Sequence, residues 1–273
     1  MQEWSLERYR INKMGHERLG FVPKTRRWQS LVNDLVKFAD GKIDVDTLSK
    51  QTLANVRSRL ENVANDDGVN AAFSYLLSLS FAAKQQDPAA ELQKVGIYSS
   101  INSNSFQIAK DLSRWIDSRI SSREYGELAK GAAIDTVTAW CYKIKGGHDN
   151  LFPIAHSDAD VWKRAGDGAG FCELSRIFFA KFTEKYISYF LEREASARLT
   201  NPIDRDRLRT ELHYHVNQLS RHAFESAKIT QSFAAGWFNK NTKEGLPSER
   251  KIRGFLWLAF DKMREELRHQ EDN

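Results

Sequence analysis

Apolar residues recur three and four positions apart along almost the whole chain, whereas strict alternation of apolar and polar positions is scarce. Recurrence at this spacing places apolar side chains on one face of an α-helix, and alternation is typical of a half-buried strand. The pattern therefore predicts an all-α protein, a multi-helix bundle of roughly eight to ten helices in two packed halves.

Capping residues, prolines and glycines indicate where the individual helices begin and end. We expect helices at about 25–39, 47–63, 68–84, 88–95, 105–120, 122–145, 158–162, 171–197, 204–240 and 248–270. Residues 98–105 are rich in Ser and Asn and are expected to form a loop. The helix over 68–84 is apolar nearly all round, which is typical of a helix at the centre of a core.

The clearest boundary in the chain is the segment from Gly146 to Pro153, which combines two glycines, polar residues and a proline. Such a segment ends a helix and is typical of a connection between packed units. It predicts an N-terminal arm at 1–24, an N-terminal helical half at 25–145 and a C-terminal helical half at 157–273. The two halves are also compatible with one continuous domain.

Composition is that of a globular protein, since 41% of the 273 residues are hydrophobic and 28% are charged. A chain of this length buries a sizeable core. No apolar run reaches the roughly 18 residues that a membrane-spanning helix needs, and no signal peptide is evident. Cys141 and Cys172 lie among apolar neighbours, as free thiols do in a reducing compartment. We therefore expect a cytoplasmic protein that does not contact a membrane.

Charge is unevenly placed, because seven basic and three acidic residues in the first 28 positions give +4 of the net +5. Aromatic and basic side chains interleave in this arm, and the candidate contact residues are Trp4, Arg8, Tyr9, Arg10, Lys13, Arg18, Lys24, Arg26 and Arg27. Such a segment suits docking on protein, or phosphate neutralisation and base stacking on nucleic acid. A solvated tail is the third interpretation.

The helical run over 204–240 is where histidines and a carboxylate recur at helical spacing. His213 and His215 point about 200° apart on a helix, and His215 and His222 are separated by about 10 Å of axial rise. Neither pair shares a metal ion easily, so we predict no metal site and no cofactor. His222 and Glu225, one turn apart, are left as weak candidates for acid–base chemistry, against a structural role in helix contacts.

Two further segments allow a packing and a binding interpretation. Asp167 to Gly170 is a small-residue turn before a helix, where backbone amides sometimes hold an anion, but no phosphate-binding motif accompanies it. We expect a tight helix–helix corner there, with close packing at Gly168 and Gly170. Trp237 and Phe238 are expected to close the core of the C-terminal half, and a partner surface is the alternative.

These patterns predict a non-catalytic cytoplasmic subunit or adaptor of a larger assembly of prokaryotic type. We expect it to dock a protein partner through the basic arm and the Trp237 region. The alternatives are a nucleic-acid-associated accessory protein that binds phosphates through the arm, and an enzyme that uses His222 and Glu225. The sequence leaves the oligomeric state open.

Overall fold

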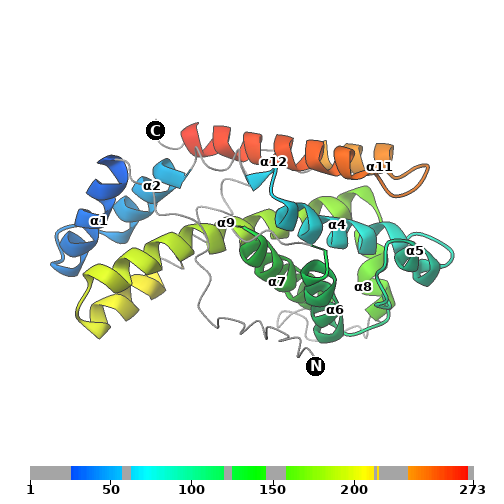
Figure 1. The fold of residues 1–273 in the computed structure, drawn as a ribbon, viewed down its shortest axis with the longest axis horizontal. Helices are drawn as coiled ribbons and strands as arrows, with labels where there is room; N and C mark the ends of the chain where they lie inside the picture. The colour runs from blue at the N-terminus through cyan, green and yellow to red at the C-terminus, as the bar shows by residue number, and fades with distance from the viewer. Residues whose placement is uncertain are drawn as a thin grey trace, which may run out of the picture.

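A computed structural model describes residues 26–56, 63–119, 125–145, 158–211, 214 and 233–269. Every regular element in these ranges is a helix and none is a strand, so the all-α prediction is confirmed. The helices are α1 Arg26–Ala39, α2 Val45–Val56, α4 Asp67–Ala82, α5 Pro88–Lys94, α6 Ser105–Asp117, α7 Gly126–Ile144, α8 Asp158–Ala165, α9 Gly168–Arg198, α11 Ala235–Asn241 and α12 Glu249–His269 (Figure 1). Residues 202–211 are also helical.

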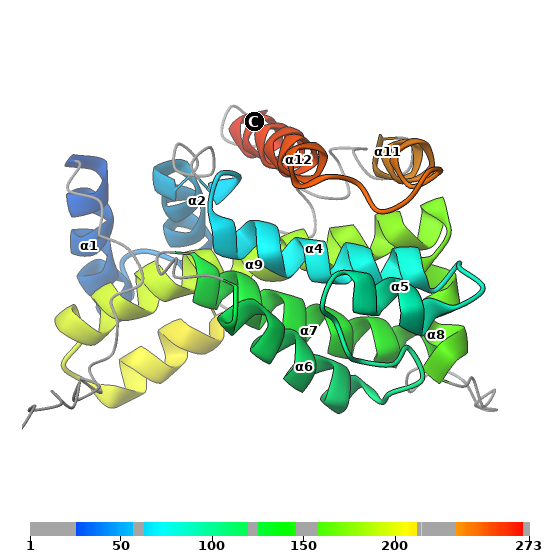
Figure 2. The same ribbon diagram turned by 45° about the vertical axis from the view of Figure 1, so that its right-hand side comes forward.

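Helix α9 is the axis of the molecule. It has 31 residues, which at 1.5 Å per residue extend about 46 Å. It packs against α4, α7, α8 and α11, and also against α1 and α2 at the opposite end of the molecule (Figures 1 and 2). α6 lies against the other side of α7, and α12 lies against α4 and α2.

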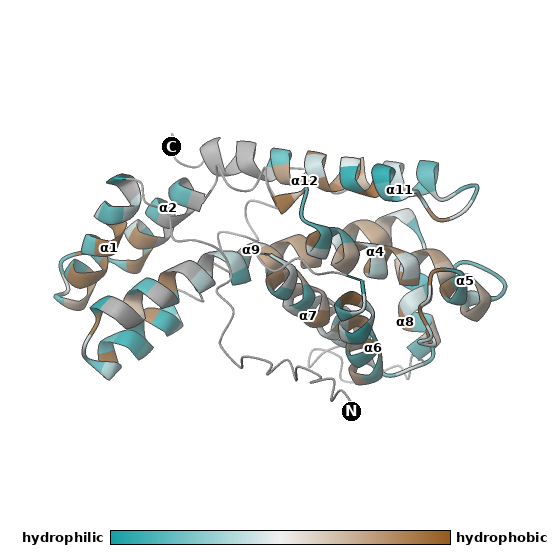
Figure 3. Cartoon of the chain, viewed as in Figure 1, coloured by the Kyte–Doolittle hydropathy of each residue, from teal (hydrophilic) through white to brown (hydrophobic). Residues whose placement is uncertain are grey.

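The core is centred on α4, of which 14 residues are buried. Hydrophobic residues dominate α4 and the parts of α7 and α9 that face it (Figure 3). Rings from three helices meet here, since Phe73 of α4 lies 5.5 Å from Phe178 of α9 and 5.2 Å from Phe255 of α12, measured between ring centroids. The prediction that the nearly all-apolar helix is central is confirmed.

Short polar side chains cap several of the helices at their starts, as the sequence signals predicted for α4 and α5. Asp66 accepts from the amides of Gly68 and Val69 at the start of α4, at 2.8 and 3.1 Å. Asp87 accepts from Ala90 N at 3.0 Å, directly before the proline that opens α5. Capping groups therefore locate these helix starts to within a residue or two of the prediction.

Several predicted bounds are wrong, and α7, for example, begins at Gly126 rather than near Ser122. α6 ends at Asp117 rather than near Ile120, because the chain turns at Ser118 and Arg119, where the Arg119 side chain donates to Val95 O. α9 begins at Gly168 rather than at Phe171, because the Asp167 carboxylate caps the helix by accepting from Gly170 N at 2.7 Å. The small-residue turn is therefore the first turn of α9.

The expected tight corner at this helix start is confirmed. A Cβ atom on Gly168 would lie 2.7 Å from Asn239 Nδ2, and one on Gly170 would lie 2.6 Å from the carbonyl carbon of Arg164. The backbones of α8 and α9 approach so closely that only glycine fits between them.

α7 of the N-terminal half and α9 of the C-terminal half pack against each other, and residues of both halves contribute to one hydrophobic core. The predicted boundary at 146–153 lies outside the described residues, so the division into halves stays a prediction.

Candidate functional site

Most of the residues that the sequence singled out lie outside the described part of the chain. These are Trp4, Arg8, Tyr9, Arg10, Lys13, Arg18 and Lys24 of the arm, with His213, His215, His222 and Glu225. Arg26 is exposed at the start of α1, and Arg27 follows it in the helix. The interpretations placed on these residues remain predictions.

The Trp237 region packs as core. Phe238 is fully buried, and its ring stacks on Phe171 with centroids 4.4 Å apart. Trp237 is partly buried, with its ring centroid 4.7 Å from that of Phe255. Both rings pack against other aromatic rings of the core, which confirms the packing interpretation of Trp237 and Phe238.

No cluster of His, Cys, Asp and Glu suited to a metal ion occurs among the described residues. In the same ranges no helix has the length and apolar character needed to cross a bilayer. Cys141 and Cys172 are both buried, and they are not joined in a disulfide.

Burial raises the pKa of the Cys141 thiol to about 11, with Lys145 lowering it and Asp158 raising it less strongly. The thiolate is the reactive form, and it is scarce until the pH approaches that value. At pH 8 we expect Cys141 in the folded protein to be alkylated by iodoacetamide about a hundredfold more slowly than in the denatured chain. Mass spectrometry of the Cys141 peptide over time measures the two rates; equal rates would contradict its burial.

One candidate binding site among the described residues is a groove along one face of α4, here called the α4 groove. Its volume is about 410 Å³, within the range of small-ligand sites. The floor is the face of α4 from Asp67 to Ser78. One wall is formed by Val95, Trp115 and Arg119, and the other by the segment from Leu246 to Arg253.

The floor of the α4 groove carries a polar stripe in an otherwise apolar helix. Asn70, Ser74 and Ser78 are spaced by four residues, which places them one above the other on one helix face. Ser74 Oγ donates to Asn70 Oδ1 at 3.3 Å, and Ser78 Oγ donates to Ser74 O at 2.8 Å. Asn70 Nδ2 has no hydrogen-bond partner among the described residues, and the atom itself is buried beneath the surface of the groove, with the residue 5% exposed.

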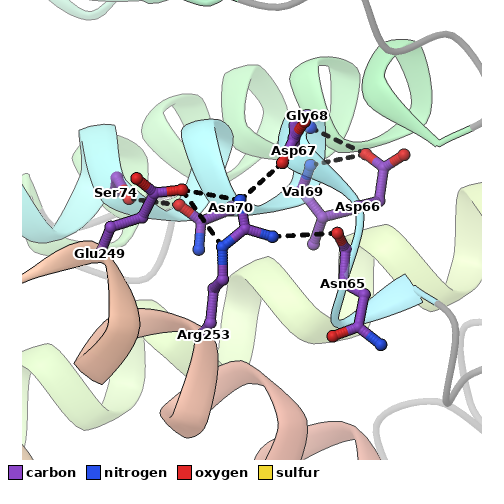
Figure 4. A network of polar contacts seen from close by, with 9 residues as sticks. All are labelled: Asn65, Asp66, Asp67, Gly68, Val69, Asn70, Ser74, Glu249 and Arg253. Atoms are coloured by element: carbon purple, nitrogen blue, oxygen red, sulfur yellow. Dashed lines mark hydrogen bonds and ion pairs between the residues drawn. The ribbon is translucent and has the colours of Figure 1, made fainter.

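The guanidinium group of Arg253 joins α12 to the start of α4 at one end of the groove (Figure 4). It donates to Glu249 Oε1 at 2.7 Å, to Asp67 Oδ1 at 2.5 Å and to Asn65 O at 3.0 Å. Hydrogen bonds to the two carboxylates raise the pKa of Arg253. The Arg253 charge is thus matched within the protein.

Trp115 separates the α4 groove from a second cavity of about 280 Å³. The Trp115 indole donates to Val95 O at 3.1 Å, and the guanidinium of Arg119 lies 4.2 Å from the ring centroid. Among the described residues no carboxylate pairs with Arg119. The wall of the groove therefore carries a cation whose charge is not matched by a described carboxylate.

A chain of hydrogen bonds lines the second cavity. Ser99 Oγ lies 2.8 Å from Tyr75 Oη and donates to Asp111 Oδ2 at 3.0 Å. Burial raises the pKa of Tyr75 well above its usual range, against the opposing effect of the bond to Ser99. A phenol with this pKa stays protonated, so the network positions the loop after α5 rather than moving a proton.

This loop and the first turn of α6 each present one aromatic side chain to solvent. Tyr98 is 86% exposed and Phe106 is 76% exposed. The neighbours Ile97, Ser99 and Ile101 are buried, which fixes the backbone from which Tyr98 projects. We call Tyr98 and Phe106 the aromatic rim.

Sequence reasoning missed both the α4 groove and the aromatic rim. The four-residue spacing of Asn70, Ser74 and Ser78 within an apolar helix was a usable signal. No sequence signal placed the α12 start beside α4.

Comparison with known proteins gives no relative that bears on these sites: no family model, no curated protein and no solved structure matches the chain.

Proposed function

We propose that the protein is a non-catalytic, cytoplasmic adaptor or subunit that binds a protein partner through the aromatic rim. The observation that carries this proposal is the exposure of Tyr98, on a loop whose backbone is held by buried neighbours, and of Phe106, in the first turn of α6.

Aromatic residues are enriched among the side chains that dominate protein–protein binding energy. Binding is weakened when a loop must become ordered on association. Here Ser99 already bonds to Tyr75 and Asp111, and Asn104 caps α6 by accepting from Gln107 N at 2.9 Å. The loop is therefore organised before a partner arrives, and a docked partner removes two large rings from water.

In this proposal the basic arm, residues 1–24, makes a second contact with the partner. The positive charge of the arm complements an acidic surface on that partner. Deleting residues 1–24 is expected to slow association more at low salt than at high salt, because charge steering is screened by ions. Binding of DNA or RNA that weakens with salt and vanishes with this deletion would favour the nucleic-acid alternative instead.

The test compares tagged full-length proteins expressed in the source cells. The double variant Tyr98→Ser with Phe106→Ser removes the rim, and Tyr142→Ser is the matched control, since Tyr142 is 54% exposed on α7. We expect at least one protein to co-purify with the wild type in stoichiometric amount. The amount of this protein recovered with the double variant should be lower by about tenfold or more, since truncating two aromatic anchors costs over 1 kcal/mol of binding free energy.

The same partner should stay bound to the Tyr142→Ser protein and should bind the purified wild-type chain directly. Both variants change exposed side chains, so their thermal unfolding midpoints should match the wild type. Equal partner recovery with the rim variant and the control would refute the proposal.

A further inference from the structure

The side of α12 that faces away from the core carries a regular stripe of its own. The stripe consists of Arg250, Gly254, Trp257 and Asp261, here called the α12 outer face. These residues are spaced by four, three and four positions, which is the spacing of the seam in a coiled coil. The opposite side of the helix holds the buried residues Ile252, Phe255, Leu256, Ala259 and Phe260. α12 lies along the outer edge of the molecule in both ribbon views (Figures 1 and 2).

Gly254 and Trp257 place a gap and a bulky group next to each other on the α12 outer face. A Cβ atom added to Gly254 would have no atom of another element within 4 Å, so a second helix can approach the backbone closely there. Trp257 is 52% exposed. A large ring that is half in water is a typical anchor for a protein contact. A facing helix therefore fits this face best if it presents a bulky group to Gly254 and a small one to Trp257.

The α12 outer face meets this requirement itself when two copies of the helix run antiparallel. A two-fold axis midway between Gly254 and Trp257 places Trp257 of each copy opposite Gly254 of the other. Arg250 and Asp261 have the same midpoint, so the same axis places the Arg250 guanidinium opposite the Asp261 carboxylate of the other copy. One patch then meets an identical patch, which is the arrangement of two-fold symmetric dimers.

The charges of the α12 outer face favour the antiparallel arrangement over the parallel one. A parallel pair would place Arg250 opposite Arg250 and Asp261 opposite Asp261, and like charges in contact weaken an interface. Among the described residues Arg250 has no carboxylate partner, since the neighbouring Glu249 pairs with Arg253. Asp261 already interacts within its own chain. A carboxylate accepts several donors, so it can also accept from an arginine of a second copy.

We propose that two copies of this chain form a dimer through antiparallel pairing of their α12 outer faces. Each copy contributes one face of one helix, which is less than a stable interface of standard size, so the dimer is weak and forms at high protein concentration. Lys251 and Lys262 stand three helical turns apart on one flank of the stripe, where long side chains reach into water. This contact lies on a different element from the aromatic rim and goes beyond the proposed function.

The first test is sedimentation equilibrium of the full-length protein over a range from about 5 μM to about 500 μM, which covers weak dimers. We expect the average mass to rise from that of the monomer toward that of a dimer and no further, because a two-fold symmetric contact closes on itself. A mass that stays monomeric at every concentration would overturn the proposal, as would growth beyond a dimer.

Two substitutions assign the dimer to the α12 outer face. Trp257→Ala removes the ring that fills the gap, and Arg250→Asp places like charges in both charged layers. Each should weaken dimerisation by about tenfold or more. Lys110→Asp is the matched control, since it reverses an exposed charge on α6 and changes the net charge by the same amount as Arg250→Asp. Unchanged dimerisation in Arg250→Asp, or an equal loss in Lys110→Asp, would contradict the proposed contact.

Mixing two charge-reversed proteins tests which residues face each other. Arg250→Asp and Asp261→Arg each put like charges in both layers of their own dimer, whereas a mixed dimer has opposite charges in both layers. A fluorescently labelled Arg250→Asp chain titrated with Asp261→Arg should therefore associate about tenfold or more tightly than either variant does with itself, measured by anisotropy. A mixture that associates no better than the separate variants would refute this pairing.

Gly254→Ala separates the dimer contact from the stability of the monomer. In dilute protein the added methyl group meets no neighbouring element, and alanine has the higher helix propensity, so the unfolding midpoint should rise. In the dimer the methyl group occupies the space of Trp257 from the second copy, so dimerisation should weaken by about fivefold or more. A Gly254→Ala protein that dimerises as strongly as the wild type would overturn the proposal.

Discussion

Replacing Gly170 by alanine should destabilise the protein by about 3 kcal/mol or more, because overpacking at a rigid contact costs this much. The new methyl carbon would overlap the carbonyl oxygen of Arg164. That oxygen belongs to the backbone of α8, so no side-chain rotation relieves the overlap, and α8 and α9 have to separate. The unfolding midpoint should fall by roughly 6–12 °C, measured by circular dichroism or calorimetry.

Gly254→Ala is the matched control for this substitution. Gly254 is exposed within α12, and no other atom would lie within 4 Å of its added Cβ. Alanine has the higher helix propensity, so this variant should gain about 0.5–1 kcal/mol. If Gly170→Ala were as stable as Gly254→Ala, the close approach of α8 and α9 would be wrong.

Truncating Phe255 to alanine should cost about 3–5 kcal/mol, as expected for a phenylalanine removed from a packed core. Phe255 is 2% exposed, and its ring centroid lies 5.2 Å from that of Phe73, 4.7 Å from Trp237 and 5.5 Å from Phe233. These rings belong to α4 and to the segment that contains α11, so Phe255 is one of the side chains through which α12 packs on the rest of the core.

The matched control is Trp257→Ala, two residues along the same helix, where the indole is 52% exposed. Because much of the Trp257 ring is in water, we expect this change to cost about 1 kcal/mol or less. Chemical denaturation of the two variants measures the difference directly. A Trp257 variant less stable than the Phe255 variant would mean that the face of α12 turned toward the core has been misassigned.

The helices were predictable from the sequence because their signals are local. Asp87 followed by proline predicts the start of α5, and Asp66 before an apolar run predicts the start of α4; both cap their helices as expected. The end of α6 was predicted wrongly because its cause is not local. Arg119 leaves the helix and donates to Val95, which lies 24 residues earlier in the chain.

The α4 groove was only partly predictable, for the same reason. The stripe of Asn70, Ser74 and Ser78 can be read from spacing alone, although the surrounding apolar residues conceal it in a search for hydrophobic periodicity. The ion pair of Asp67 with Arg253 joins residues 186 positions apart. No single sequence without relatives indicates such a pairing, because either residue has many other possible partners of opposite charge.

The central position of α9 has a consequence for biosynthesis. Five helices that pack against it, α1, α2, α4, α7 and α8, precede it in the chain, so their apolar faces leave the ribosome before their shared partner has been made. At about 5–20 residues per second, the interval between the end of α7 and the end of α9 lasts roughly 3–11 s. During each round of translation the faces of these helices that α9 will cover are without their final packing partner for that time.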